Sequence, residues 1–386
     1  MRKEYLRVAM LDLSPKTPHY SFILVHEISR KTDSVGLVLN NSSFWLEEFD
    51  QNIPIGDYAT VSVEKKNKSK VLKLIDYLQS LLRVLFSMLI LKKWNVVHIQ
   101  WTLLGNNPAG LETLLYKTLK KRGIKVVYTI HNVLPHNTGQ KYFNQYQSIY
   151  KEVDVLICHT QDTRKQLQRD FGIESSKLKY VPLGDLNEGL AKNMQVTKNT
   201  GSKKILLYGR LTEYKGVDFL LTAMRSLLDS KPEVFADVKI VLAGRAKPDY
   251  EKEITEQIQA FRLEEIVDCK FKYHSDEDLM RMIKNADCSV FPYKHITQSA
   301  ALLNALFLGA PVICSDLEGF KEAVEHEVSG LVFERDNVED FGKCLERVLT
   351  DSKFAQQLGE NAKASAEEKF SWRKISDLTL KVYEEL

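Results

Sequence analysis

Short apolar segments alternate with longer amphipathic segments along most of the chain. This alternation is typical of parallel sheets built from βαβ units, in which a helix follows each strand and crosses back over the sheet. The segments predicted as strands in the first half are 6–12, 35–39, 95–100, 125–130, 154–159 and 179–181. The helices predicted between them include 19–31, 71–92 and 108–121.

The second half repeats the pattern after a polar interruption at residues 184–203, which combines Asn, Thr, Gly and Lys and predicts a linker. The strands predicted after it are 204–208, 238–243, 268–271, 288–291, 311–314 and 330–333. The helix predicted after Gly216 has apolar side chains on one face, at Val217, Leu220, Leu221, Met224 and Leu228. The pattern therefore predicts an α/β protein with two Rossmann-like, doubly wound parallel-sheet domains facing a cleft.

Composition agrees with two globular domains. The chain has 386 residues, of which 44% are hydrophobic and 27% charged, and this length exceeds that of one typical domain. The formal charge of +3 results from 54 basic and 51 acidic residues. A balance this close to neutral argues against a protein that wraps nucleic acid, which needs many phosphate contacts.

The cysteines and the first residues bear on the compartment. The five cysteines are an odd number without a CxxC pair, and several lie in apolar segments, which suits a reducing compartment. The opening MRKEYLRVAMLDLSP has too short an apolar run for a signal peptide. We therefore expect a cytoplasmic protein.

Residues 71–91 form the longest largely apolar segment, but they include Lys73, Asp76 and Arg83. A spanning helix would expose these charges to lipid at a cost of several kcal/mol. The basic residues 65–70 (KKNKSK) allow a peripheral helix at the inner face of an anionic membrane. The alternative is a helix that packs on the core behind a solvated loop, which is the commoner use of such a pattern.

Residues 203–224 (KKILLYGRLTEYKGVDFLLTAM) carry the strongest chemical signal. Gly209 allows a ligand to approach the backbone closely, and the helix that begins near Gly216 offers free N–H groups to an anion. Arg210 and Lys215 place two fixed cations there, the charge needed to hold a diphosphate and stabilise it as a leaving group. The alternative is an ordinary strand–turn–helix connection with solvated charges.

The segment GRLTEYKG (209–216) resembles the phosphate-binding segment of family 4 glycosyltransferases, which have the two-domain GT-B architecture. Further segments follow in the order of that family: VLAGR, YHSDEDLMRMIKNADCSVFPY, ALFLGAPVICSD and VSGLVFE. The last residues, FSWRKISDLTLKVYEEL, resemble the family's terminal helix, which crosses back onto the first domain. The resemblance is close over 203–334 and loose elsewhere.

The resemblance implies an acceptor domain at 1–188, with a helix at about 370–386 packed back on it, and a donor domain at 203–369. It implies a retaining enzyme that moves a hexose-type sugar from a UDP- or GDP-linked donor to a saccharide or lipid-linked acceptor in polysaccharide or glycan synthesis. Arg210 and Lys215 would bind the donor diphosphate and neutralise the departing phosphate. Gly244, in VLAGR, and Tyr273, near the nucleotide base, would complete this part of the donor site.

The chain departs from the family's Glu-x7-Glu pattern before the strand at 311–314. Ile296 and Asn304 stand where the two carboxylates would be. Asn304 retains groups that can bind a ribose hydroxyl, because its amide offers both an acceptor and donors, whereas the Ile296 side chain offers none. The donor identity is the property that this departure affects most.

The helix predicted at 300–308 starts after three polar residues that the resemblance places in the donor site, Thr297, Gln298 and Ser299. Ser299 is a candidate N-cap. Alternatively, the backbone N–H groups of Ser299 and Ala300 face the donor phosphate. The two roles are compatible, and the sequence favours neither.

In the first domain, His131 follows the strand at 125–130. The resemblance implies that it contacts the donor sugar; the alternative is a buried, hydrogen-bonded structural imidazole. His136 is a weaker candidate. The family's glycine-rich loop after the first strand is missing here, and His19 and Tyr20 occupy that region as candidate acceptor-loop residues or simply as the start of a helix.

Other motifs are excluded or reinterpreted. Asp276, Glu277 and Asp278 match a metal-binding DxD pattern, but they open a predicted helix, where carboxylates suit the dipole. The chain has no HExxH, GxSxG or GxxxxGK[ST] motif. We therefore expect no metal and no cofactor besides the nucleotide sugar as substrate. The rival hypotheses are a catalytically silent subunit that stabilises an active partner, and a GT-B epimerase or phosphorylase.

Overall fold

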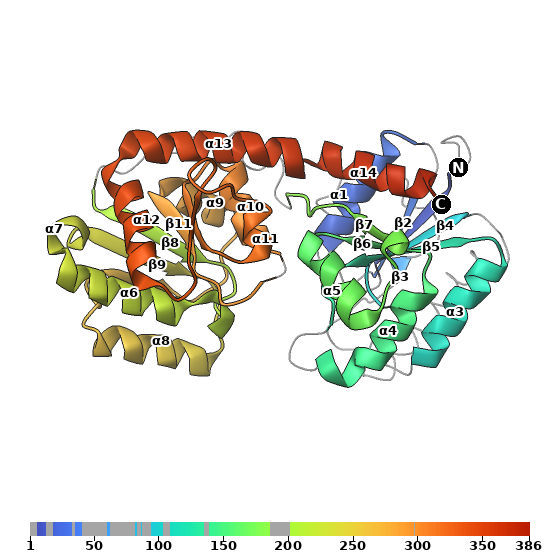
Figure 1. Ribbon diagram of the computed structural model, residues 1–386, viewed down its shortest axis with the longest axis horizontal. Coiled ribbons are helices and arrows are strands. Elements are labelled where there is room, and N and C mark those ends of the chain that lie inside the picture. Colours follow the sequence, from blue (N-terminus) through green and yellow to red (C-terminus); the bar gives the residue numbers. More distant parts are fainter. Residues whose placement is uncertain are drawn as a thin grey trace. The chain divides into compact units, whose positions relative to one another are not determined.

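The computed structural model describes residues 6–12, 18–32, 35–40, 60–61, 82, 86, 94–102, 109–134, 139–185, 201–296 and 298–386. The chain divides into two compact units, shown in Figure 1. The first unit comprises Met1–Gly184 and Trp372–Leu386, and the second comprises Asp185–Ser371. The predicted limits at 188, 369 and 370 lie within a few residues of these, whereas the second domain was predicted to begin only at 203, after a linker that the division assigns to the second unit. Most of that linker, 186–200, lies outside the described residues.

The first unit contains a parallel seven-stranded sheet with the order β3-β2-β1-β4-β5-β6-β7. Its strands are β1 (Val8–Asp12), β2 (Val35–Asn40), β3 (Thr60–Val61), β4 (Val96–Ile99), β5 (Lys125–Ile130), β6 (Val155–Cys158) and β7 (Leu178–Tyr180). The six strands predicted for this half are confirmed, because buried strands of a parallel sheet are apolar on both faces. The two-residue strand β3 is too short to give such a pattern.

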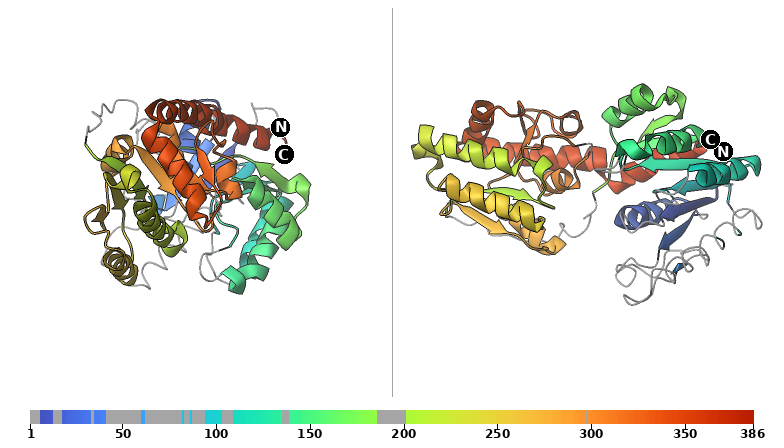
Figure 2. Two further views of the ribbon diagram at one scale, coloured as in Figure 1. Left: turned by 60° about the vertical axis from the view of Figure 1, so that its left-hand side comes forward. Right: turned by 90° about the horizontal axis from the view of Figure 1, so that it is seen from below.

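The helices of the first unit lie on both faces of its sheet (Figures 1 and 2). They are α1 (Pro18–Ser29), α3 (Ala109–Lys121), α4 (Phe143–Glu152), α5 (Gln161–Phe171) and α14 (Trp372–Glu384), with short 3-10 helices η2 (Gly139–Tyr142) and η3 (Ser175–Lys177). Of the helix predicted at 71–92, the structure describes only Leu82 and Phe86, which are helical and exposed. Among the described helices, none has both the length and the apolar character that crossing a bilayer requires.

The second unit contains a parallel six-stranded sheet with the order β10-β9-β8-β11-β12-β13. Its strands are β8 (Lys203–Tyr208), β9 (Val238–Ala243), β10 (Val267–Lys270), β11 (Cys288–Phe291), β12 (Val312–Ser315) and β13 (Leu331–Phe333). All six were predicted within a residue or two at each end. The unit therefore has the doubly wound form that the sequence indicates.

Helices also cover both faces of the second sheet (Figures 1 and 2). They are α6 (Val217–Ser230), α7 (Pro232–Phe235), α8 (Pro248–Ala260), α9 (Asp276–Asn285), α10 (Ala300–Phe307), α11 (Glu318–Lys321), α12 (Val338–Thr350) and α13 (Ser352–Phe370), with the 3-10 helix η4 (Glu213–Lys215). In doubly wound sheets, ligands bind beyond the carboxyl ends of the strands, where the strand order reverses. The loops after β1, β4, β8 and β11 are therefore the first places to search for a site.

The C-terminal helix α14 completes the first unit although it follows the second unit in sequence. Trp372 is 1% exposed, and its ring meets that of Tyr20 on α1 with centroids 5.3 Å apart. Lys31 donates to Ser376 Oγ over 2.7 Å and lies 2.8 Å from Asp377 Oδ1. Phe370 is the last residue of α13, so the terminal helix starts two residues later than predicted.

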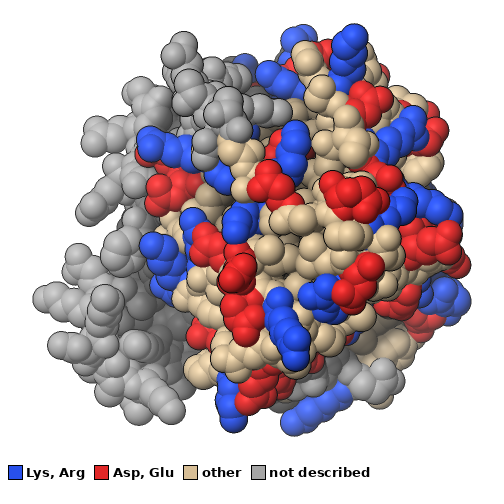
Figure 3. All heavy atoms as spheres, turned by 90° about the vertical axis from the view of Figure 1, so that its left-hand side faces the viewer, with Lys and Arg blue, Asp and Glu red and all other residues tan. Residues whose placement is uncertain are grey.

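Surface charges are mixed. On the face shown in Figure 3, the described Lys and Arg side chains are interspersed with Asp and Glu, and neither sign covers a large area. Many are paired within one helix, as in the i,i+4 pairs Arg225–Asp229 and Arg281–Glu277. Exposed pairs of this kind contribute little stability, so the energetics of the fold depend mainly on the two apolar cores.

We predict that Trp372→Ala destabilises the first unit by about 3–5 kcal/mol, the cost of deleting a buried indole. The first unit should then lose structure at a lower urea concentration than in the wild type, measured by far-UV circular dichroism. Leu111→Ala is the control, because Leu111 is 61% exposed and its truncation should change the stability by less than about 0.5 kcal/mol. Equal urea midpoints for all three proteins would show that α14 does not stabilise this unit.

Candidate functional site

The loops after β8 and β9 run side by side in the second unit. The N–H of Gly209 donates to Ala243 O over 2.9 Å, and that of Leu211 donates to Arg245 O over 2.9 Å. Gly209 has φ of 95° and Gly244 has φ of 145°, and a Cβ on Gly244 would lie 1.8 Å from Gly209 O. Only glycine fits this approach of two backbones, so the two predicted glycines form one bare backbone surface.

Lys215 is buried beside this surface, at the end of η4. The residue is 5% exposed, and its Nζ donates to Tyr208 O over 2.7 Å and to Tyr293 Oη over 2.8 Å. A Cβ on Gly209 would lie 2.7 Å from the same Nζ, so the glycine makes room for it. Both partners are neutral, and burial lowers the pKa of Lys215 to about 8. An ammonium has three N–H donors, so one of them has no hydrogen-bond partner among the described residues.

Tyr293 links Lys215 to the start of α10. It is 1% exposed and follows β11, and its hydroxyl also has a hydrogen bond with Ser299. Ser299 Oγ accepts from the N–H of Leu302 over 3.1 Å, so the predicted N-cap is confirmed. Tyr208 Oη donates to Ala301 O, which fastens the same helix turn to β8. That the N–H groups of Ser299 and Ala300 face a phosphate stays a prediction.

Asn304 lies one turn further along α10 and is 9% exposed. Its Oδ1 is buried and has no hydrogen-bond partner in the described part of the chain. A buried acceptor without a partner is costly, so Asn304 suits a ligand that brings a hydroxyl. Ile296 and Gln298 are half-buried, and Thr297 lies outside the described residues.

Arg210 and Tyr273, also predicted for the donor site, are exposed. The Arg210 side chain has no hydrogen bond or ion pair with the residues that the structure describes. Tyr273 is 58% exposed, and the Arg245 guanidinium carbon lies 5.2 Å from its ring centroid, within cation–π range. The expectation of two fixed cations is therefore corrected: Lys215 is held in place, whereas Arg210 extends into solvent because no described side chain holds it.

His131 follows β5 in the first unit and is half-buried. Its Nε2 lies 2.8 Å from Gln100 Oε1, and its ring stacks on Trp101 with centroids 5.0 Å apart. Burial, followed by the neighbouring His159 and His98, lowers the pKa of His131 well below its usual value. The imidazole is therefore neutral at physiological pH. The imidazole is both hydrogen-bonded and partly accessible. It is therefore compatible with contact to the donor sugar and with a purely structural role.

The sequence reasoning missed three polar residues beside His131. Gln100 follows β4, His98 lies on that strand, and His159 follows β6. His98 Nδ1 lies 2.6 Å from Tyr383 Oη, and His159 Nδ1 lies 2.8 Å from Val181 O. Burial lowers the pKa of His98 to about 3 and that of His159 to about 4. The available signal was a polar residue at the carboxyl end of each apolar strand.

The candidate acceptor residues His19 and Tyr20 lie in the first turn of α1. The side chain of His19 is outside the described residues, as is His136. Tyr20 is 1% exposed, and its ring meets those of His131, His159 and Trp372. Its hydroxyl is buried without a hydrogen-bond partner among the described residues. Tyr20 is thus a buried helix residue and not part of an open loop, and its acceptor role stays a prediction.

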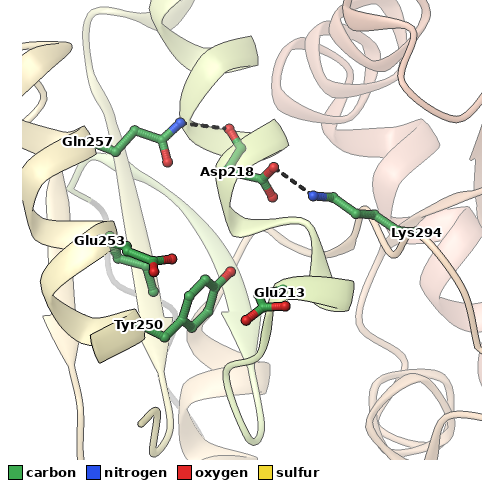
Figure 4. A pocket seen from close by; sticks show the side chains of 7 residues that line it. Glu213, Asp218, Tyr250, Glu253, Gln257 and Lys294 are labelled. Atoms are coloured by element: carbon green, nitrogen blue, oxygen red, sulfur yellow. Dashed lines mark hydrogen bonds and ion pairs between the residues drawn. The ribbon is translucent and has the colours of Figure 1, made fainter. Parts of the chain in front are cut away.

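A pocket of about 140 Å³ lies elsewhere in the second unit, between α6, α8 and the loop after β11. Figure 4 shows Glu213, Asp218 and Glu253 around it, with Lys294 Nζ 2.7 Å from Asp218 Oδ2. Burial, assisted by these three carboxylates, raises the pKa of Tyr250. Three carboxylates against one lysine give the pocket a net negative charge, which repels a diphosphate. This pocket therefore does not suit the donor phosphates.

The acidic sequence 276–278 forms the first turn of α9. Ser275 caps this helix by accepting from the N–H of Asp278 over 3.1 Å, and Glu277 pairs with Arg281. The interpretation of these carboxylates as a helix start is confirmed. In the described ranges, no three His, Cys, Asp or Glu side chains gather closely enough to hold a metal ion.

The burial of Lys215 predicts a specific pH dependence of stability. Its pKa is about 8 in the folded chain and 10.5 as the reference value, so between these values the unfolded chain binds more protons and stability rises with pH. Relative to Lys215→Met, the wild type should gain roughly 2–3 kcal/mol between about pH 7 and pH 10. Urea unfolding at both pH values measures this gain. Lys252→Met, at an exposed lysine, controls for the lost charge, and a Lys215→Met curve parallel to the wild type would contradict the prediction.

Both units match known protein families. Residues 191–365 match the family described as glycosyl transferases group 1, and residues 51–185 match the family described as glycosyltransferase family 4. The chain is 27% identical over 250 residues to an uncharacterized glycosyltransferase of Methanocaldococcus jannaschii, and 25% identical over 252 residues to a D-inositol 3-phosphate glycosyltransferase of Corynebacterium jeikeium. Each alignment covers 62% of this chain, and they cover 62% and 59% of the two relatives, less than two thirds of their length.

Solved structures share the architecture over nearly the whole chain. The HepE protein of Anabaena in complex with UDP has a TM-score of 0.74 and 17% identity, with 99% of this chain and 100% of that chain covered. The sucrose-phosphate synthase of Thermosynechococcus elongatus has a TM-score of 0.71 and 15% identity, with 98% of both chains covered. Structural likeness at such low sequence identity shows the fold alone. The family matches add that the sequence of each unit is similar to glycosyltransferase sequences. The chain therefore has the GT-B fold, and its two units match two glycosyltransferase family models.

Proposed function

We propose that the chain is a retaining glycosyltransferase of family 4 that moves a hexose-type sugar from a nucleotide-diphosphate donor to a saccharide or lipid-linked saccharide. The observation that carries the proposal is the buried ammonium of Lys215, whose two partners are neutral. A buried cation without a counter-ion is costly, and a diphosphate would supply the missing charge. Cell-surface polysaccharide or glycan synthesis is the process that such a transfer serves.

Lys215 would act on the leaving group. As the bond from the sugar to the diphosphate breaks, negative charge grows on the β-phosphate, and a preorganised N–H donor stabilises that charge more than it stabilises the bound donor. Arg210, which directly follows Gly209 and is exposed, would bind the phosphates as a second cation. Retention would follow if the acceptor attacks from the face that the diphosphate leaves, through an oxocarbenium-like state.

The proposal gives the other predicted residues roles in donor binding. Gly209 and Gly244 provide backbone that a phosphate can approach, and Asn304 offers its unpaired Oδ1 to a ribose hydroxyl. Tyr273, stacked with Arg245, would lie near the nucleotide base. His131 would contact the donor sugar. UDP is the favoured nucleotide because the HepE structures contain UDP or UDP-glucose, and GDP is the alternative.

The first unit would bind the acceptor, and His19 and Tyr20 would belong to the acceptor site. Peripheral membrane contact would suit a lipid-linked acceptor, and it is supported by the exposed apolar side chains of Leu82 and Phe86, which are 65% and 56% exposed. The basic segment 65–70 that precedes them lies outside the described residues. No metal or further cofactor enters the proposal.

The second candidate function is a catalytically silent subunit that stabilises an active partner. The replacement of two family carboxylates by Ile296 and Asn304 favours it. The enclosed position of Lys215 favours the enzyme, because a silent subunit has no need for a buried, uncompensated ammonium. Transfer from, or hydrolysis of, a nucleotide sugar by the purified chain alone would decide for the enzyme.

We predict that one nucleoside diphosphate among UDP, GDP and ADP, or one of their sugars, stabilises the chain selectively. At a hundred times its dissociation constant, a bound ligand adds about 2.7 kcal/mol to the free energy of unfolding. A thermal-shift series with the three nucleotides measures this effect and identifies the base. The corresponding monophosphates are the control. The absence of a shift with all three diphosphates would contradict the donor site.

We predict that Lys215→Met lowers the turnover number by about 10²–10³-fold, the usual cost of removing one donor that stabilises a developing anion. The fold should persist, because methionine fills a similar volume without a buried charge. Lys294→Met is the matched control, since Lys294 belongs to the acidic pocket and pairs with Asp218. An unchanged turnover in Lys215→Met would remove the assigned role.

A further inference from the structure

A buried polar chain leads from the C-terminal helix to His131: Tyr383, His98, Gln100 and His131, each within hydrogen-bond range of the next. We infer that Gln100 is a positioning residue that holds His131 in the tautomer with hydrogen on Nε2 and so presents its bare Nδ1 to the ligand. The inference rests on the proposed function, in which His131 contacts the donor sugar. It assigns roles to Gln100, His98 and Tyr383.

The amide of Gln100 has two different ends, and each meets an imidazole. Its carbonyl Oε1 lies 2.8 Å from His131 Nε2, and its Nε2 lies 3.4 Å from His98 Nε2 and also contacts Met10 Sδ. A carbonyl oxygen only accepts a hydrogen bond. Therefore His131 Nε2 carries the hydrogen and donates it to Gln100.

Met10 determines which way the amide points, because its sulfur can only accept a hydrogen bond and therefore faces the amide nitrogen, 2.8 Å away. The amide nitrogen of Gln100 only donates, so His98 Nε2 must be its acceptor. The hydroxyl of Thr129, whose Oγ1 lies 2.6 Å from the same Nε2, then donates as well. The hydrogen of His98 consequently lies on Nδ1 and is donated to Tyr383 Oη over 2.6 Å. A flipped amide would place its carbonyl oxygen against the Met10 sulfur, which has no hydrogen to donate.

Burial makes this arrangement a fixed one. Gln100 and His98 are fully buried, so water cannot replace a lost partner. Both imidazoles are neutral because burial lowers their pKa values, so each has one N–H and one bare nitrogen. Tyr383, on α14, is also fully buried and closes the far end of the chain.

The consequence lies at the other face of His131. In the described part of the chain, the structure shows one hydrogen-bond partner for this imidazole, at Nε2, and the residue is only half-buried. Its Nδ1 is thus left for a ligand and acts as an acceptor. A bare nitrogen takes a hydrogen bond from a sugar hydroxyl and enriches the hydroxyl oxygen in electrons, which suits the positive charge of an oxocarbenium-like ring.

Imidazole nitrogen NMR of the full-length protein tests the inference without substrate. In chain labelled with 15N-histidine, with His131 identified by its absence in His131→Asn, we expect a protonated Nε2 and a bare Nδ1. Gln100→Leu should convert this single state into a mixture of tautomers. Gln100→Glu, which keeps an acceptor at the same place, should restore the Nε2–H form. Tyr383→Phe should increase the Nδ1–H form, because His98 loses its acceptor and the amide can flip.

Gln147→Leu is the matched control, because Gln147 donates to Phe171 O from α4 of the same unit without contact to an imidazole. It should leave the His131 tautomer unchanged. A single Nε2–H state retained in both Gln100→Leu and Tyr383→Phe would overturn the inference, and if Gln100→Leu does not fold, retention in Tyr383→Phe alone overturns it.

With donor and acceptor present, the turnover number of Gln100→Leu should fall roughly tenfold to a hundredfold, as when a partner that orients a functional histidine is removed. Gln100→Glu should recover part of this loss.

These readouts separate two kinds of failure. If the chain transfers no sugar but the tautomer responds as expected, the proposed function fails and the positioning role of Gln100 stands. If transfer occurs and the tautomer does not respond, the positioning role fails and the function stands.

Discussion

The ammonium of Lys215, enclosed by a backbone carbonyl and a phenol, is the interaction on which the candidate site of the second unit depends. Its position requires Gly209, since any side chain there would collide with Nζ. It also requires Tyr293, which connects the same nitrogen to the cap of α10. Strand β8, η4 and α10 are thereby joined around a single charge. Because no carboxylate among the described residues compensates that charge, a bound anion would stabilise the unit.

The candidate site of the first unit depends on neutral hydrogen-bonded groups and not on a buried charge. Its working residues also follow parallel strands, but here burial keeps the groups neutral and hydrogen bonds determine where each proton lies. His131, Gln100 and His98 form a chain of hydrogen bonds in which the Nδ1 of His131 has no partner among the described residues. Each group in this network depends on the orientation of its neighbour, so a flip of the Gln100 amide would change the tautomer of the adjacent histidine. Tyr383 extends this dependence to the last helix of the chain.

The sequence was sufficient for most of the fold and for part of the site. Buried parallel strands are apolar on both faces, so they could be recognised individually, whereas β3, with two residues, could not. Lys215 and Gly209 were recognised because they are close in sequence. Their partner Tyr293 is separated from Lys215 by 78 positions and meets it only because β11 lies next to β8 in the sheet. A pattern cannot reveal which charged loop residue is buried, and for this reason Arg210 and Lys215 seemed equivalent.

The difference between these two cations is a consequence of strand order and has a functional meaning. Lys215 is held by groups from β8 and from the residue after β11, so its charge is in place before a ligand arrives and little reorganisation is needed when negative charge develops. Arg210 has no such partner among the described residues, and it must lose conformational entropy to bind a phosphate. A flexible guanidinium is nevertheless able to follow the diphosphate as it departs. In the proposed transfer, a held ammonium and an exposed guanidinium would divide leaving-group stabilisation between two residues that are five positions apart in the sequence.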